Sequence, residues 1–117
     1  HPTPDGQDFL LTHNAAQTIL SPTGALRGER ARRFRHCLEE WLSAGGKTLV
    51  LDLSQVHDMD ALALSILCAL AHEIRAMEGS LTLVRVTSAV RSLLTYLKLD
   101  REFTLSDDRG KGLESDE

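Results

Sequence analysis

The stretch Thr48–Leu53, TLVLDL, is nearly continuously apolar and carries a single charged residue, Asp52. Such a run is typical of a central strand that is covered on both faces of a sheet. A polar loop over 55–60 follows, and then comes the apolar stretch Ala61–Ala71, ALALSILCALA, whose large residues recur at helical spacing. A buried strand, a loop and a helix in this order indicate a domain of the α/β class.

The segments on both sides continue the alternation between strands and helices. We expect the helix that begins at Ala61 to end near Glu78, just before Gly79, and Asp60 to cap its start. A third helix should follow, with Ser88 as its cap. The further elements that the sequence predicts are strands at 8–13, 18–20, 81–86 and 103–105 and a first helix at 28–43.

This order of elements predicts a small mixed β-sheet of four or five strands. Strands that are joined through a helix should lie parallel to each other, with right-handed crossovers. The helices should then pack mainly on one side of the sheet. The whole arrangement requires one hydrophobic core, which a chain of 117 residues is long enough to bury.

The composition and its distribution define the domain boundaries. Hydrophobic residues make up 42% of the chain and charged residues 26%, which is typical of a globular domain. We expect a flexible lead-in at 1–7 and one domain at 8–105. The remainder, 106–117, is rich in Asp, Glu and Gly and is predicted to be a disordered acidic tail.

Charge and cysteine content exclude several classes of function. A net charge of -4 disfavours general nucleic-acid binding, which depends on neutralising phosphates. No stretch reaches the roughly 18 apolar residues of a membrane span, so we expect no direct membrane insertion. Cys37 and Cys68 form no C-x-x-C pair, which favours a reduced, cytoplasmic protein. A Gly-rich phosphate loop is also missing from the sequence.

Three blocks of sequence carry a family resemblance: Thr48–Ser54 with Met59 and Asp60 after its loop, then Leu64 and the helix that follows, then Gly79–Val84 with Ala89–Leu94 and Leu99–Phe103. In order and spacing they resemble the STAS family, the fold of anti-sigma-factor antagonists and of the cytoplasmic ends of sulfate transporters. The resemblance covers nearly all of the predicted domain. It implies the same small mixed sheet that the order of elements predicts.

The resemblance also implies a function. It indicates a regulatory protein–protein interaction module like an anti-sigma-factor antagonist, with an anti-sigma factor or a kinase-like protein as its partner. Neither enzymatic activity nor a cofactor is expected. An alternative is a STAS subunit of a phospholipid ABC transporter, or a domain of an anion transporter, with a transporter subunit as the partner. The partner that copurifies with the chain would separate the two.

One position departs from the family pattern. In signalling members, the residue after the Asp that corresponds to Asp60 is a Ser or Thr that a partner kinase phosphorylates. Here it is Ala61, which has no oxygen to accept a phosphoryl group. Ser65, one turn further along the helix, is the substitute candidate, and its alternative role is a hydrogen bond to a backbone carbonyl. The resemblance therefore implies partner binding without the usual phosphorylation switch.

The resemblance places the docking surface at the start of the second helix. The apolar residues there also include a set beyond the core stripe, which either faces a partner or is buried under the N-terminal segment. The candidate partner-binding residues are Asp58, Met59, Asp60, Ala61, Leu62, Leu64, Ser65 and Cys68, and the extra apolar set consists of Leu62, Leu64, Cys68 and Ala71.

Three polar features have a structural and a functional interpretation. His57, Asp58 and Asp60 could hold a metal, but we expect a solvated loop with Asp60 as the helix cap and no metal. Asp52 could mark a site, but we expect its carboxylate to accept from loop N–H groups. The arginine run Arg27–Arg35 could dock an acidic partner, but we expect a solvated helix face. The cysteines lack a base at sequence level, so no catalytic residue is predicted.

Overall fold

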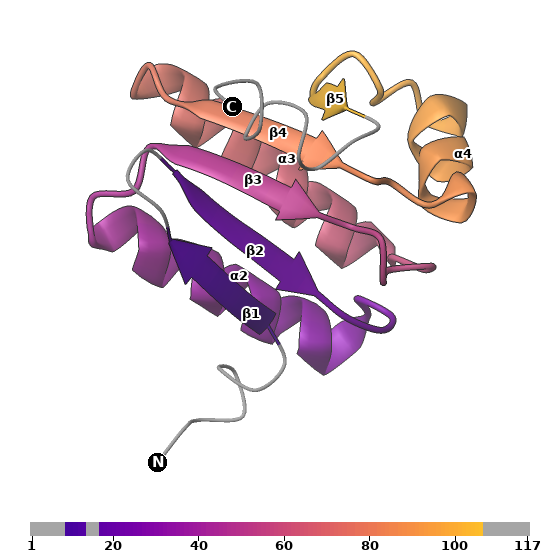
Figure 1. Cartoon of the computed structure of the whole chain (residues 1–117). Helices are drawn as coiled ribbons and strands as arrows, with labels where there is room; N and C mark the ends of the chain where they lie inside the picture. The colour runs from indigo at the N-terminus through magenta and orange to yellow at the C-terminus, as the bar shows by residue number, and fades with distance from the viewer. Residues whose placement is uncertain (1–8, 14–16, 107–117) are drawn as a thin grey trace, which may run out of the picture.

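The computed structural model describes residues 9–13 and 17–106 of the chain. Within these residues, one sheet contains the strands in the order β1-β2-β3-β4-β5 (Figure 1). Strand β1 is antiparallel to β2, and the other neighbouring pairs are parallel. The predicted mixed sheet is thereby confirmed. The strands are β1 Phe9–His13, β2 Thr18–Pro22, β3 Thr48–Asp52, β4 Ser80–Val84 and β5 Thr104–Ser106.

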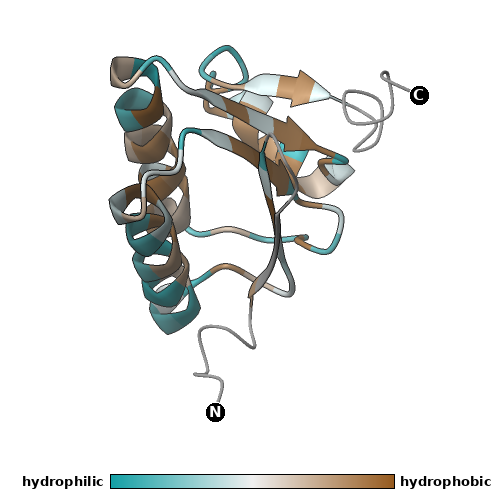
Figure 2. Ribbon diagram, turned by 60° about the vertical axis from the view of Figure 1, so that its left-hand side comes forward, coloured by the Kyte–Doolittle hydropathy of each residue, from teal (hydrophilic) through white to brown (hydrophobic). Residues whose placement is uncertain are grey.

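The helices connect the parallel strands. They are α2 Gly28–Ser43, α3 Ala61–Ala76 and α4 Ser88–Tyr96. Helices α2 and α3 form a layer against one side of the sheet (Figure 2). Helix α4 contributes Val90 and Leu94 to the same core. The prediction that the helices pack mainly on one side is therefore confirmed.

Residue alternation in the central strand explains where the core lies. Leu49 and Leu51 of β3 are completely buried in the main cluster, together with the apolar stripes of the helices. Val50, between them in sequence, points to the other face and packs in a separate small cluster with Ile19 and Val84. Strand β3 is thus buried on both faces, as its continuous apolar sequence predicts.

The C-terminal end of α2 is attached to the sheet through Trp41. Its indole Nε1 donates a hydrogen bond to the hydroxyl oxygen of Thr18 in β2 at 3.0 Å. The turn that follows the helix lies directly against the ring: a Cβ at Gly46 would be 2.1 Å from an indole carbon. Only glycine fits at this position, which is why the sequence places glycines immediately after α2.

Two predicted element ends on the chain are wrong. Helix α3 ends at Ala76 and not near Glu78, because Glu78 has a left-handed φ of 62° and Gly79 N donates to the carbonyl of Ile74. Helix α4 is capped by Thr87 and not by Ser88, since the Thr87 hydroxyl accepts from Val90 N.

Strand β4 also ends early, at Val84, because Arg85 has a left-handed φ of 50°. Strand β5 includes Ser106, which was predicted to belong to the tail. The rest of the predicted tail, 107–117, and the predicted lead-in, 1–7, lie outside the described residues.

Candidate functional site

The starts of α2 and α3 are held side by side by their preceding loops. Leu26 N donates to the carbonyl of Asp58 at 2.9 Å, and Asp60 N donates to the carbonyl of Leu26 at 3.1 Å. These bonds make an isolated parallel bridge between Leu26 and Met59. We call this region, residues 23–28 and 52–60, the loop edge. It fixes the position of the first turn of α3 relative to α2.

One carboxylate in the loop edge connects both helices. Asp60 Oδ1 accepts from Ala63 N at 2.9 Å and so caps α3, while Oδ2 accepts from Gly28 N at 2.8 Å, at the start of α2. The Gly28 and Ala63 hydrogen bonds lower the pKa of the Asp60 carboxyl below its usual value. Both helix N-termini carry partial positive charge, which a carboxylate complements. The predicted cap is confirmed, and it has a second role.

The neighbouring polar residues of the loop form a surface ion pair. Arg27 Nη1 lies 2.7 Å from Asp58 Oδ2, with both side chains about half exposed. This hydrogen bond raises the pKa of Arg27 above its usual value. His57 is exposed. Across the described ranges, no group of three or more His, Cys, Asp or Glu side chains is placed to hold a metal ion.

Asp52 is the buried carboxylate of the loop edge, with an exposed fraction of 2%. Its Oδ1 accepts from Ser54 N at 3.0 Å, as expected from the sequence, and its Oδ2 lies 2.9 Å from Arg85 Nη2. Burial alone would raise the pKa of Asp52, but the hydrogen bonds from Arg85 and Ser54 outweigh it and lower that pKa. This pairing has no signal in the sequence, because Arg85 follows a different strand.

Two of the predicted docking residues lie in the core. Met59 is 3% exposed and Leu64 is 7% exposed. Ala71, from the extra apolar set of α3, is also buried. All three residues belong to the main hydrophobic core. Burial therefore explains Leu64 and Ala71 of the extra apolar set.

The other predicted docking residues reach the surface at the start of α3. Asp58, Ala61 and Ser65 are exposed, and Asp60, Leu62 and Cys68 are half-buried. The Ser65 hydroxyl donates to the carbonyl of Leu62 at 2.9 Å, which is the structural role that the sequence left open. The surface at this end of α3 is therefore a small, mostly uncharged patch beside the loop edge.

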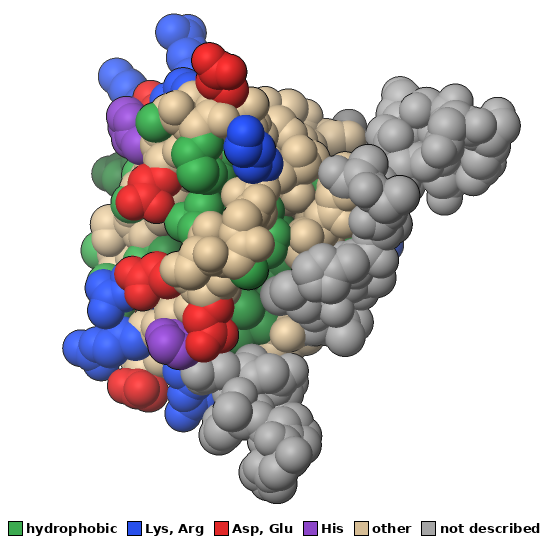
Figure 3. Space-filling model, turned by 90° about the vertical axis from the view of Figure 1, so that its left-hand side faces the viewer, with side chains coloured by type: hydrophobic (Ala, Val, Ile, Leu, Met, Phe, Trp, Pro, Cys, Tyr) green, Lys and Arg blue, Asp and Glu red, His purple; other side chains and the backbone are tan. Residues whose placement is uncertain are grey.

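The arginines of α2 are mostly engaged within the chain. Arg27 pairs with Asp58, and Arg32 lies 3.4 Å from Glu29. The Arg30 guanidinium donates to the carbonyls of Ala25 and Thr23 and lies 5.4 Å from the centroid of the Phe9 ring. These contacts agree with the structural interpretation of the arginine run. Charged side chains gather over the helical layer, with hydrophobic side chains visible among them (Figure 3).

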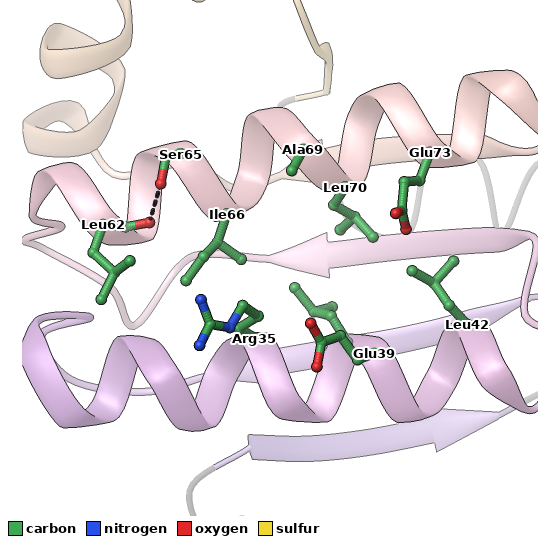
Figure 4. Close-up of a pocket in the computed structure, with 10 residues that line it drawn as sticks. Arg35, Glu39, Leu42, Leu62, Ser65, Ile66, Ala69, Leu70 and Glu73 are labelled. Atoms are coloured by element: carbon green, nitrogen blue, oxygen red, sulfur yellow. Dashed lines mark hydrogen bonds between the residues drawn. The ribbon is translucent and has the colours of Figure 1, made fainter.

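An apolar groove lies between α2 and α3, on the side away from the sheet, with a cavity volume of about 210 Å³ (Figure 4). The sequence did not indicate it, because it is made by side chains from two helices. It begins at Leu62 and Ser65 of the candidate docking surface and continues along the two helices. Within the described residues, none of the helices is both long and apolar enough to cross a membrane.

Comparison with known proteins agrees with the fold. The family model of the STAS domain matches residues 9–112. The chain therefore belongs to the STAS domain family. A TM1081 homologue from Thermotoga neapolitana, named as a proposed anti-sigma factor antagonist, is 28% identical over 97 residues, which are 82% of this chain and 86% of the relative.

Solved structures show the same fold. The crystal structure of TM1081 from Thermotoga maritima, a proposed anti-sigma factor antagonist, has a TM-score of 0.86 at 24% identity and covers 97% of both chains. The crystal structure of an anti-sigma factor antagonist from Mycobacterium paratuberculosis has a TM-score of 0.82 at 22% identity, over 98% of this chain and 97% of that chain.

Proposed function

We propose that this protein is a cytoplasmic regulatory module of the anti-sigma-factor-antagonist kind, which binds a protein partner through the start of α3. Membership of the STAS family and the similarity to the Thermotoga neapolitana relative support this function. The contact residues are Ala61, Leu62, Ser65, Cys68 and the exposed Asp58. Met59 and Leu64 hold the surface in position from the core.

The observation that carries the proposal is the exposed Ala61 in the first turn of α3, directly after a cap that is already bonded. A phosphate at this position would add charge to a nearly neutral surface. Alanine cannot receive it, so the surface stays in its binding state. Ser65 offers no equivalent, because it lies within the helix and its hydroxyl is bonded to Leu62.

A capture experiment with matched variants tests this surface. The tagged full chain, the Ala61→Glu variant and the Ala76→Glu variant are incubated with lysate of the native cell, and bound proteins are quantified by mass spectrometry. Ala61→Glu places an acidic side chain where a helix N-terminus favours it, so the fold should persist. Ala76 is exposed on the same helix, about 22 Å away, and serves as the control.

We expect an anti-sigma factor or kinase-like protein to bind the wild type and the Ala76→Glu variant. Ala61→Glu should capture it roughly tenfold less, because the added charge must be desolvated in the interface. Equal capture by all three chains would contradict the proposal. Capture of an ATPase subunit or a membrane permease in place of the regulatory protein would favour the transporter alternative.

A phosphorylation assay tests the missing switch with the captured kinase. Intact-mass measurement after incubation with ATP should show no phosphate between residues 61 and 65 of the wild type. The Ala61→Ser variant restores a hydroxyl at the exposed position and should acquire one phosphate. A wild-type chain phosphorylated at Ser65 would show that the switch has moved along the helix.

A further inference from the structure

The groove between α2 and α3 is an apolar channel with two side walls. Both helices begin at the loop edge, where Asp60 joins them, and they run in the same direction (Figure 4). Leu38, Ile66 and Leu70 are buried at 2%, 7% and 4% exposure and form its floor. Leu42 and Leu62 are half-buried and Ala69 is exposed along its walls.

The spacing of these residues suits a helix. Leu62, Ile66 and Leu70 follow each other at intervals of one turn along α3. Leu38 and Leu42 do the same on α2. A third helix can place its own apolar ridge into the groove between two such rows, as helices do when they pack on one another.

Three charged side chains border the groove, and their arrangement is asymmetric. Arg35 lies nearer the start of the helices, whereas Glu39 on α2 and Glu73 on α3 lie further along on opposite sides (Figure 4). In the described part of the chain, none of these three side chains forms an ion pair or hydrogen bond, whereas Arg32 and His36 of α2 lie close to Glu29 and Glu40.

Two carboxylates that flank an apolar channel repel each other and attract a cation between them. The C-terminal ends of both helices add partial negative charge on the same side. A Lys or Arg of a docked segment could reach Glu39 and Glu73 together, with its aliphatic stem on the apolar floor. An acidic residue near the other end of the segment would meet Arg35.

We propose that the groove binds an amphipathic helix of the protein partner, with an apolar stripe on the floor and a Lys or Arg between Glu39 and Glu73. This inference rests on the proposed function, because Leu62 and Ser65 belong to both surfaces. The docking surface at the start of α3 thereby continues into the groove. The charge pattern fixes the direction in which the partner helix lies.

A peptide selection tests the proposal without knowledge of the partner. A display library of amphipathic helical peptides, about 18 residues long and randomised at two polar positions, is selected on the full chain. The enriched peptides are then titrated against the wild type and against Ala69→Arg, in which a bulky, charged side chain at the groove wall fills the groove. Arg is a good helix former, so the fold should persist. Circular dichroism checks that each variant is folded.

We expect the enriched peptides to carry a Lys or Arg at one of the two randomised positions. Their affinity should fall roughly tenfold on Ala69→Arg and on the double variant Glu39→Lys with Glu73→Lys, since two attractive pairs become repulsive. Glu40→Lys is the matched control: Glu40 is exposed on α2 and pairs with His36 outside the groove.

Three results would overturn the proposal. These are a failure to enrich any peptide, enriched peptides that bind Ala69→Arg as well as the wild type, and a wild-type dimer that Ala69→Arg dissociates, which assigns the groove to a second copy. Capture of the native partner by the Ala61→Glu and Ala69→Arg variants shows whether the groove proposal or the proposed function has failed. A partner lost by Ala61→Glu but retained by Ala69→Arg overturns the groove alone, and a partner retained by both overturns the proposed function.

Discussion

The loop edge and the α2–α3 groove use their charged residues in opposite ways. In the loop edge, the side chains of Asp52, Asp58 and Asp60 all have partners within the chain. In the groove, Glu39 and Glu73 border an apolar channel without an ion pair to the described residues. The first region stabilises the fold, and the second is available to a partner. Removing a carboxylate should therefore lower stability in the first region and binding in the second.

The largest effect should come from the buried carboxylate of the loop edge. Asp52→Ala removes the carboxylate that pairs with Arg85 and accepts a hydrogen bond from Ser54 N. We expect the free energy of unfolding in urea to fall by about 3 kcal/mol, the lower end for breaking a buried pair, because Arg85 is half exposed. The double variant with Arg85→Ala should cost less than the sum of the single variants. A loss of less than about 1 kcal/mol would show that Asp52 does not stabilise the fold as a buried ion pair does.

Asp60→Ala should have the next largest effect, since it removes the acceptor of Ala63 N and Gly28 N at once. We expect Tm in a thermal scan to fall by roughly 5 °C, the size of a lost helix cap in a small domain. Asp60→Ser is the control, because a hydroxyl caps a helix but cannot reach both N–H groups. An unchanged Tm for Asp60→Ala would mean that the two helix starts do not depend on this carboxylate.

Acid should weaken the loop edge and so distinguish it from the groove. The folded pKa values of Asp52 and Asp60 are lowered, so their stabilisation is complete above the unfolded pKa of about 3.9 and is lost as pH falls through the folded values. The free energy of unfolding of the wild type, measured in urea, should fall progressively below about pH 5. Asp60→Ser has one fewer such group, so its curve should fall less steeply. Parallel curves would contradict this assignment.

The smallest effect on stability should come from the groove. Glu39→Gln together with Glu73→Gln removes two carboxylates that repel each other and have no described partner. We expect the free energy of unfolding to rise by less than about 0.5 kcal/mol, because the repulsion between the two carboxylates is removed. Glu40→Gln, which removes the partner of His36, is the comparison. A loss comparable to that of Asp52→Ala would show that the groove carboxylates also stabilise the fold.

The sequence predicted the framework where local signals were sufficient. Helix α2 has the predicted bounds, because its apolar stripe ends at two glycines that the turn requires. The start of α3 was found through Asp60, which is a strong capping residue. The ends at Ala76 and Val84 were missed, since the left-handed backbone there occurs at Glu78 and Arg85 and not at glycines.

The site was predicted less completely, because its contacts join distant parts of the chain. Asp60 and Gly28 are 32 positions apart, and Asp52 and Arg85 are 33 apart. The family resemblance placed Met59 and Leu64 in the docking surface, but these two residues face the core. The groove needs the positions of two helices and has no local signal.

Trp41 is the single tryptophan of the chain and lies 7% exposed at the end of α2 opposite the loop edge. Its indole is bonded to Thr18 and packed against the turn at Gly46, and it is not among the side chains that line the groove. Tryptophan fluorescence therefore has one emitter, whose environment changes when the helix leaves the sheet. A ligand in the groove should leave the emission spectrum nearly unchanged. The emission of Trp41 therefore reports unfolding of the domain without interference from binding in the groove.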